Sequence, residues 1–304
     1  MDSGLYKPKH LQRGDKVGIV CTARHIAVED IEFSLDIIRS WGLVPVLGES
    51  VGAKENQFAG SDLLRRNDFQ RMLDDSQIRA IIGAKGGYGT VRMMDTLDFT
   101  RFMNDPKWVC GFSDLTILHN HIQNALGVRS LHSPMLSTFK TSTNSAMESM
   151  RQLLFGEEVV YPISEHVLNR EGKAEGVLIG GNLSLIYSLL SGPTAFSTHS
   201  KILFLEDLDE YLYHIDRMMM SLKRAGRLQG ISGLLVGGMT DMKDNTIPFG
   251  MSAEEIILNH IVSEIPVIFG FSAGHVSENY SLELGAQYKI KVEKRRGSLE
   301  RLRS

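Results

Sequence analysis

The chain has few cysteines, no long apolar run and no strong excess of either charge. Its two cysteines make no disulfide framework, and both Cys21 and Cys110 lie in apolar, strand-like runs, so we expect buried free thiols. No stretch approaches the apolar length of a membrane span, and the first ten residues lack the apolar core of a secretory signal. A net charge of −3 argues against nucleic-acid or membrane-surface binding. We therefore expect a cytoplasmic protein.

The composition that is present is typical of a globular protein. With 304 residues, of which 42% are hydrophobic and 23% charged, the chain can bury a substantial core and is long enough for two domains. In its first half, short apolar runs alternate with amphipathic segments, which indicates an α/β domain with a parallel, doubly wound sheet. We expect strands at 16–21, 44–47 and 78–84, and helices at 28–41, 61–73 and from about 91.

The second half continues with strands and helices of different spacing. We place one domain at residues 1–145, a linker at 146–171 and a second domain at 172–304. Strands are expected at 159–161, 174–179, 201–205, 231–237 and 266–271, with an edge strand at 288–294; helices are expected at 183–190, 211–228 and 253–264. The methionines at 218–220 fit core packing, and the charged residues 294–304 fit a solvated tail.

A serine stands at the junction of an apolar run and a helical pattern. The run ends at Gly111, Ser113 follows, and residues 114–126 carry apolar side chains at spacings of three and four. Such a serine lies at the positive end of the helix dipole, beside free backbone N–H groups, as in a nucleophile elbow. The pattern G-x-S-x-G is not met, because Leu115 replaces the second glycine. The alternative is that Ser113 or Asp114 only caps the helix.

A glycine-rich loop follows the apolar strand at 78–84. Its residues are Lys85, Gly86, Gly87, Tyr88 and Gly89, and glycine lets a backbone approach a bound group closely. The loop fits neither phosphate-binding pattern of glycines, so a simple tight turn is the alternative. Because loops after neighbouring parallel strands share one edge of the sheet, we expect this loop to lie beside Ser113.

Two further apolar strands lead to groups that complete a serine hydrolase. A serine hydroxyl needs a base, which is usually an imidazole, and a carboxylate that orients the imidazole. Glu206 and His275 follow strands and could supply both, while His119 and His121 are rival bases on the helix after the serine. We expect no metal, because no set of ligands has a metal-binding spacing.

Five motifs in order resemble the LD-carboxypeptidase family of serine peptidases, over about residues 16–290. They are Gly86-Gly87-Tyr88-Gly89, Gly111 to Thr116, Gly180 to Ser184, Leu205-Glu206-Asp207 with Tyr213 to Met218, and Gly274-His275. The family includes muramoyl-tetrapeptide carboxypeptidases and microcin C immunity peptidases. The resemblance implies a flavodoxin-like N-terminal domain, a smaller β-rich α/β C-terminal domain and a homodimer.

The resemblance also implies an activity and its residues. The expected activity is release of terminal D-alanine from cytoplasmic muropeptide tetrapeptides during cell-wall recycling, without metal or organic cofactor. The implied triad is Ser113, Glu206 and His275, the oxyanion hole is made by the N–H groups of Gly87 and Asp114, and the substrate-binding residues are Lys85, Gly86, Tyr88 and Asn182.

The chain departs from the family pattern at two loops. Lys85 stands where related sequences usually carry arginine, and Cys21-Thr22-Ala23-Arg24 replaces a loop of the Ala-Pro-Ser type. Both departures concern substrate recognition more than the type of reaction. The alternatives are a peptidase that cleaves aminoacyl-nucleotide peptides and, from another class, a non-catalytic protein that binds a small anion.

Overall fold

The computed structural model describes residues 5–192, 196–261 and 264–302, which fall into two compact units. The N-terminal unit comprises Leu5–Val159 and the short returning segment Ser277–Glu283. The C-terminal unit comprises Val160–Val276 and the chain from Leu284 onward. The boundaries differ from the predicted ones, because the predicted linker begins inside a helix of the N-terminal unit and a later segment returns to that unit.

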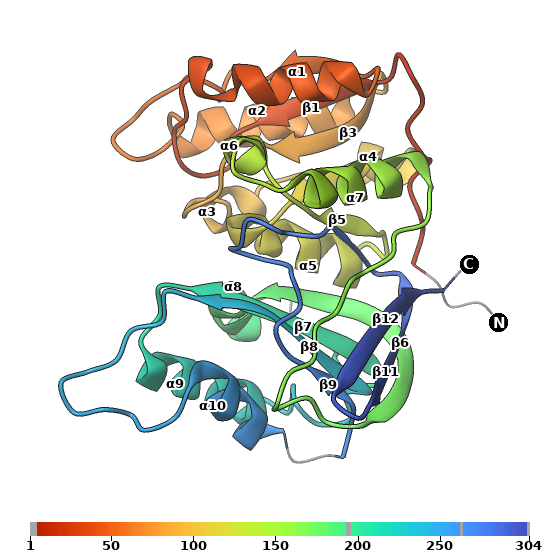
Figure 1. The fold of residues 1–304 in the computed structure, drawn as a ribbon. Coiled ribbons are helices and arrows are strands. Elements are labelled where there is room, and N and C mark those ends of the chain that lie inside the picture. The colour runs from red at the N-terminus through yellow and green to blue at the C-terminus, as the bar shows by residue number, and fades with distance from the viewer. Residues whose placement is uncertain (1–4, 193–195, 262–263, 303–304) are drawn as a thin grey trace. The chain divides into compact units, whose positions relative to one another are not determined.

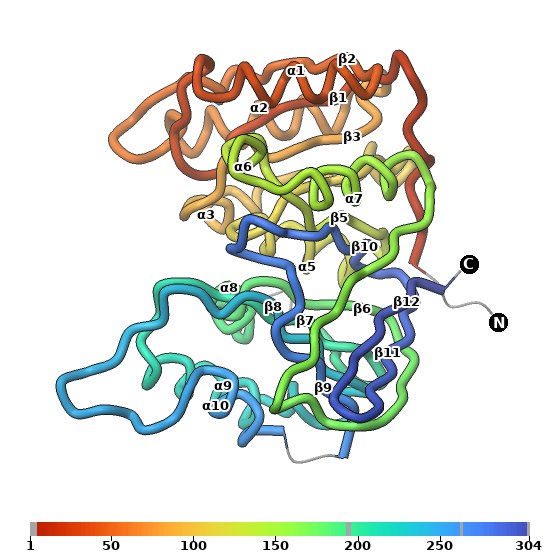
Figure 2. The backbone as a smooth tube through the Cα atoms, viewed as in Figure 1, coloured from red at the N-terminus to blue at the C-terminus, as the bar shows by residue number. Residues whose placement is uncertain are grey.

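The N-terminal unit is built on a six-stranded sheet in the order β10-β5-β4-β3-β1-β2 (Figure 1). Its strands are β1 Lys16–Val20, β2 Val44–Leu47, β3 Ile78–Gly83, β4 Trp108–Gly111, β5 Ser130–His132 and β10 Leu282–Leu284. Neighbours among β1 to β5 pair in parallel, in the flavodoxin-like order 2-1-3-4-5. The predicted α/β class with a parallel sheet is therefore confirmed. Figure 2 follows the chain back to β10, beside β5.

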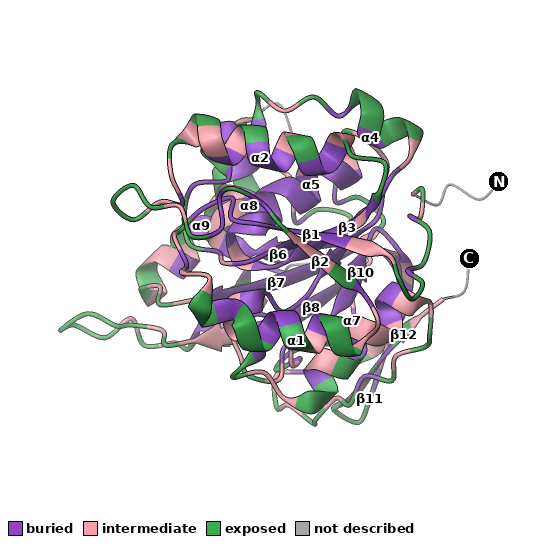
Figure 3. Cartoon of the chain, turned by 90° about the horizontal axis from the view of Figure 1, so that it is seen from above, coloured by how far each residue is buried: buried purple, intermediate pink, exposed green. Residues whose placement is uncertain are grey.

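Helices cover both faces of this sheet. They are α1 Glu32–Ser40, α2 Asp62–Asp74, α3 Val91–Met94, α4 Thr100–Asn104, α5 Thr116–Asn124, α6 Leu136–Phe139 and α7 Asn144–Phe155, with 3-10 turns η1 Glu29–Ile31 and η2 Ser113–Leu115. Val17 and Ile19 of β1 share a core cluster with apolar residues of α1 and α7. Side chains alternate along a strand, so Gly18 faces the opposite side, where a Cβ would lie 2.8 Å from the sulfur of Met72 on α2. Figure 3 shows the buried strands between helices whose outer faces are exposed.

The C-terminal unit has a mixed sheet in the order β12-β11-β6-β7-β8-β9. Its strands are β6 Gly172–Asn182, β7 Lys201–Leu208, β8 Gly233–Thr240, β9 Val267–Ile268, β11 Gln287–Glu293 and β12 Arg296–Arg301; its helices are α8 Leu183–Ser188, α9 Leu212–Arg224 and α10 Ala253–His260, with the 3-10 turn η3 Leu189–Ser191. Strands β6 to β9 are parallel, and β11 and β12 are antiparallel. Met218 and Met219 of α9 are fully buried in the core, as predicted, whereas Met220 is 42% exposed and does not take part in core packing. No helix of the described chain combines the length and the apolar character that crossing a membrane requires.

Several predicted elements are wrong. Residues 159–161 form no strand, and the first residues of the predicted linker, from 146 onward, lie in α7, where Ala146, Ser149 and Met150 are buried. The predicted solvated tail contains β12, which pairs with β11 and leaves β11 inside the sheet. The strand was not predicted because its composition is mostly charged. An edge strand needs to bury only alternate side chains, and here Leu299 is buried between the exposed Ser298 and Glu300.

We expect Leu299→Ala to destabilise the C-terminal unit by about 2–4 kcal/mol, because it removes a buried side chain opposite Ile290 of β11. Ser298→Ala, one position away on the exposed face, serves as the control and is expected to change stability by less than about 0.5 kcal/mol. Urea unfolding followed by circular dichroism measures both. Equal stability of the two variants would contradict the packing of β12.

Candidate active site

Ser113 sits at a sharp turn between β4 and the α5 helix. After Gly111 the backbone is extended at Phe112, and Ser113 then adopts a φ of +58°, in the left-handed region that non-glycine residues rarely occupy. A left-handed serine costs of order 1–3 kcal/mol and is typical of active sites. Ser113 is the first residue of the 3-10 turn η2. The N-cap positions of η2 and α5 are held by Phe112 and Leu115, so neither Ser113 nor Asp114 is the capping residue.

Close packing of glycines holds this turn in place. Gly111 has a φ of +149°, and a Cβ there would lie 2.5 Å from Leu115. A Cβ on Gly86 would lie 3.2 Å from Ser113 Cβ and 3.3 Å from Ser113 Oγ. The backbone of the glycine-rich loop therefore touches the serine side chain, as predicted from the neighbouring positions of β3 and β4 in the sheet.

The side chain of Asp114 ties the loops of this edge together. It is fully buried, and its Oδ2 accepts a hydrogen bond of 2.8 Å from the Thr90 backbone N–H. The Thr90 hydroxyl in turn donates to the Thr22 hydroxyl at 2.8 Å. Burial raises the pKa of the Asp114 carboxyl, against the hydrogen bonds from Thr90. The sequence predicted a backbone donor or a helix cap at Asp114, and it gave no signal for this buried side-chain contact.

The rival base His119 on α5 is engaged elsewhere, and the ring of His121 packs against Phe99, with 4.9 Å between the ring centroids. His119 is buried, with Nε2 2.8 Å from the carbonyl oxygen of Gly111 and Nδ1 3.0 Å from the hydroxyl of Ser130. Burial lowers the pKa of His119 to about 4, and burial likewise lowers the pKa of His121. Both nitrogens of His119 thus serve to brace β4 and β5, which leaves the ring no proton-transfer role at Ser113.

Glu206 and His275 form a hydrogen-bonded pair within the C-terminal unit. The Nδ1 of His275 lies 2.7 Å from Oε2 of Glu206, whose side chain is fully buried, while the side chain of His275 is 15% exposed. The predicted position of Glu206 is directly after the strand, but the residue lies inside β7. The geometry is that of a carboxylate that orients an imidazole and fixes its tautomer.

Glycines next to the pair make this contact possible. Gly274 has a φ of +102°, and a Cβ there would lie 2.5 Å from Oε2 of Glu206. The register of β7 with β8 shifts beside Glu206, because Leu205 pairs with Val236 but Asp207 pairs with Met239. The extra residue in β8 is a bulge, a feature that re-aims side chains near functional sites.

The charges of β7 act directly on His275. Burial by itself lowers the pKa of His275, but the hydrogen bond and the charge of Glu206, with a contribution from Asp207, outweigh burial and raise that pKa above its ordinary value of 6.5. Burial, followed by the charge of Glu206, raises the pKa of Asp207 to about 7. The ring is therefore a stronger base than a free histidine.

Asp207 and Asn182 form a second network at the ends of β6 and β7. Oδ1 of Asp207 accepts a hydrogen bond of 2.9 Å from Nδ2 of Asn182, and Oδ2 accepts one of 2.9 Å from the Ser184 backbone N–H. Oδ1 of Asn182 accepts from the Ser184 hydroxyl at 2.7 Å and from Leu185 N, so this side chain caps α8. Both residues are buried. Asn182 thus has a clear structural role, and its contact with substrate stays a prediction.

The remaining predicted binding residues lie on the glycine-rich loop. Lys85 is half-buried, Gly86 is buried against Ser113, and Tyr88 is 47% exposed with its ring 6.4 Å from that of Phe58. Gly87 is exposed, with a φ of +113°.

In the described parts of the chain, no group of three or more histidine, cysteine, aspartate or glutamate side chains is arranged to hold a metal.

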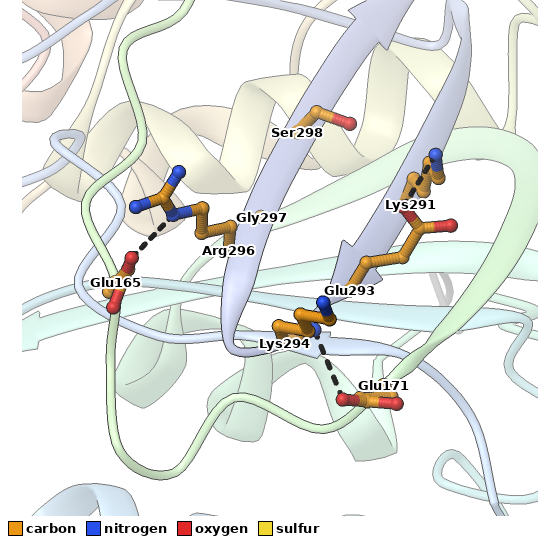
Figure 4. A pocket seen from close by; sticks show the side chains of 8 residues that line it. All are labelled: Glu165, Glu171, Lys291, Glu293, Lys294, Arg296, Gly297 and Ser298. Atoms are coloured by element: carbon orange, nitrogen blue, oxygen red, sulfur yellow. Dashed lines mark hydrogen bonds and ion pairs between the residues drawn. The ribbon is translucent and has the colours of Figure 1, made fainter.

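A hollow of about 760 Å³ on the β11–β12 hairpin is lined mainly by charged residues that pair with one another (Figure 4). Arg296 pairs with Glu165, Lys291 with Glu293 at 2.8 Å, and the Lys294 backbone N–H with Glu171 at 3.0 Å.

Family models match both halves of the chain. The model of the LD-carboxypeptidase N-terminal domain matches residues 17–133, and that of the LD-carboxypeptidase C-terminal domain matches residues 175–290. A probable murein peptide carboxypeptidase of Bacillus subtilis is 34% identical, over 97% of this chain and 94% of its own. The murein tetrapeptide carboxypeptidase of Pseudomonas aeruginosa is 27% identical, over 89% of this chain and 91% of its own.

Solved structures share the fold across both units. The muramoyltetrapeptide carboxypeptidase of Oxalobacter formigenes has a TM-score of 0.83 at 22% identity, covering 94% of this chain and 98% of its own. An MccF-like protein of Bacillus anthracis has a TM-score of 0.84 at 22% identity, covering 98% of this chain and 99% of its own. At this identity the likeness establishes the fold alone.

We expect Glu206→Gln to lower the pKa of His275 below that of the wild type, because it removes the charge that outweighs burial. NMR titration of the histidine rings measures the change, with His275→Gln identifying the signal. By linkage, the wild-type pair stabilises the fold most below pH 6.5, and this stabilisation fades as pH rises through the raised pKa.

Glu210→Gln is the matched control, because it breaks a similar pair with His214 on α9. It should leave the titration of His275 in place. An unchanged His275 titration in Glu206→Gln would contradict the pairing.

Proposed function

Because the chain belongs to the LD-carboxypeptidase family and is a carboxypeptidase, we propose that it releases terminal D-alanine from muropeptide tetrapeptides by serine catalysis. The scissile bond joins an L-centre to the D-alanine. The names of the two relatives, a murein peptide and a murein tetrapeptide carboxypeptidase, support this substrate class. The observation that carries the proposal is the strained, left-handed Ser113 against Gly86.

We propose that Ser113 is the nucleophile, His275 the general base and Glu206 the group that orients the base. Ser113 Oγ attacks the amide carbonyl carbon while His275 takes the hydroxyl proton. His275 then gives that proton to the nitrogen of the leaving D-alanine, the C–N bond breaks and an ester forms on Ser113. Water attacks the ester by the same route and restores the serine. The buried Glu206 beside Nδ1 of His275 supports these roles.

The proposed oxyanion hole consists of the backbone N–H groups of Gly87 and Asp114. Two features support it: Asp114 is the second residue of η2, the turn that leads into α5, and its side chain is fixed by Thr90. Donors that are held in place before charge develops are worth roughly 3–4 kcal/mol each in the transition state. Lys85, Gly86, Tyr88 and Asn182 complete the proposed substrate-binding set.

The wider setting is part of the same proposal: a cytoplasmic enzyme of cell-wall recycling that acts as a homodimer. The alternative substrate is an aminoacyl-nucleotide peptide, since solved structures of the microcin C7 immunity protein share this fold. An adenylate needs a stacking surface, and the loop from Asp241 to Met251 offers one aromatic residue, Phe249. The muropeptide is therefore preferred.

We expect Ser113→Ala to lower the rate of D-alanine release by up to roughly a millionfold, because it removes the nucleophile. Mass spectrometry of a tetrapeptide muropeptide mixture after incubation measures the loss of one D-alanine. Ser142→Ala, a serine elsewhere in the same unit, is the control and should keep full activity.

Three outcomes of this experiment would change the conclusion. Retained cleavage by Ser113→Ala would exclude the triad. Loss of wild-type activity on addition of a chelator would indicate a metal hydrolase. Cleavage of an aminoacyl-sulfamoyl adenosine, with none of the muropeptide, would favour the alternative substrate.

A further inference from the structure

Arg24 lies on the loop after β1, directly over the glycine-rich loop. A Cβ on Gly87 would lie 2.5 Å from Cδ, 2.6 Å from Cγ and 2.8 Å from Nε of Arg24. The arginine side chain therefore occupies the space that any other residue at position 87 would fill. Gly86, the preceding residue, lies beside Ser113, since a Cβ on Gly86 would be 3.2 Å from Ser113 Cβ, and consecutive Cα atoms are about 3.8 Å apart. Arg24 and Ser113 thus contact adjacent residues of one loop.

The backbone of Arg24 is held from two sides. Its N–H donates to the carbonyl oxygen of Gly86 at 3.3 Å, and it forms an antiparallel bridge with Phe58. Phe58 is itself fixed, since the guanidinium of the buried Arg65 lies 4.8 Å from the ring centroid and that of Arg92 lies 5.4 Å from it. The position of Arg24 over the loop is therefore built into the fold of this unit.

The guanidinium of Arg24 has no ion-pair partner among the described residues. Across the described ranges 5–192, 196–261 and 264–302, no carboxylate lies within ion-pair distance of its guanidinium, although Arg65 and Arg92 both pair with Asp62. Arg24 is exposed, whereas Lys85 is half-buried. Of these two cations, Arg24 is the more accessible to a ligand from solvent.

We infer that Arg24 binds the terminal carboxylate of the peptide, on the leaving-group side of Ser113. The inference rests on the proposed function, since a carboxypeptidase must recognise a free carboxylate a few bonds from the carbonyl under attack. A guanidinium offers two parallel N–H donors that match the two oxygens of a carboxylate, which a lysine ammonium does not. Arg24 thereby selects peptides that end in a carboxylate over the same peptides ending in an amide.

The test compares one tetrapeptide ending in D-alanine with the same peptide ending in D-alanine amide. We expect Arg24→Gln to reduce the ratio of the two kcat/KM values by roughly 10- to 150-fold, the range for a hydrogen bond to a charged group. Arg24→Lys keeps the charge without the planar fork and should retain part of the preference. Arg39→Gln removes an exposed arginine of α1 that pairs with Asp36, and it should leave the ratio unchanged.

Binding provides a readout that does not need turnover. In the Ser113→Ala background, Arg24→Gln should weaken calorimetric binding of the carboxylate peptide by a similar factor and leave that of the amide peptide unchanged. An unchanged ratio in both measurements would overturn the inference, as would a loss of preference in Lys85→Gln but not in Arg24→Gln. A wild type that binds and discriminates the peptides but releases no D-alanine would contradict the proposed function and leave the assignment of Arg24 supported.

Discussion

The left-handed backbone of Ser113 is the constraint on which the rest of the N-terminal unit depends. The conformation places the serine side chain against Gly86 and turns the chain directly into η2 and α5. It is kept because Gly111 allows Leu115 to pack closely and because Asp114 is buried under Thr90. Each of these contacts would be lost if the turn relaxed to an ordinary helix start. The strain is therefore balanced by packing around the serine rather than by the serine itself.

In the C-terminal unit, surrounding contacts likewise offset a local cost, which here is the burial of two adjacent carboxylates. Glu206 and Asp207 are consecutive in β7, and both are buried, which is costly for two carboxylates side by side. Each has its own polar partner: His275 for Glu206, and the Asn182 cap of α8 for Asp207. The bulge in β8 and the positive φ of Gly274 provide the space for the first of these contacts. One strand thereby orients the imidazole of His275 and anchors a helix.

The pattern of residues predicted most of the strands and which loops lie side by side, but by itself it did not predict which side chains far apart in the chain contact one another. The alternation of apolar runs gave the parallel sheet, and the neighbouring β3 and β4 brought Gly86 to Ser113 as predicted. The strand β12 escaped prediction because its buried Leu299 is surrounded by charged residues. The buried hydrogen bonds of Asp114 with Thr90 and of Asp207 with Asn182 were also not predicted, since a sequence does not tell which acids near a motif face inward. His119 looked like a base by position, and only its two ring contacts show otherwise.

The two loops at which the chain departs from its family's pattern are coupled in space. The loop from Cys21 to Arg24 and the loop at Lys85 are joined by the hydrogen bond from Arg24 N to Gly86 O and by the contact of Thr22 with Thr90. A change in one loop therefore alters the surroundings of the other. Lysine at 85 offers a point charge beside the glycine-rich loop, while arginine at 24 offers a planar donor next to the same glycines. In the proposed function, the donor for the carboxylate is therefore Arg24 rather than residue 85, and the hydrogen bond from Arg24 N to Gly86 O keeps this donor close to the loop that lies beside Ser113.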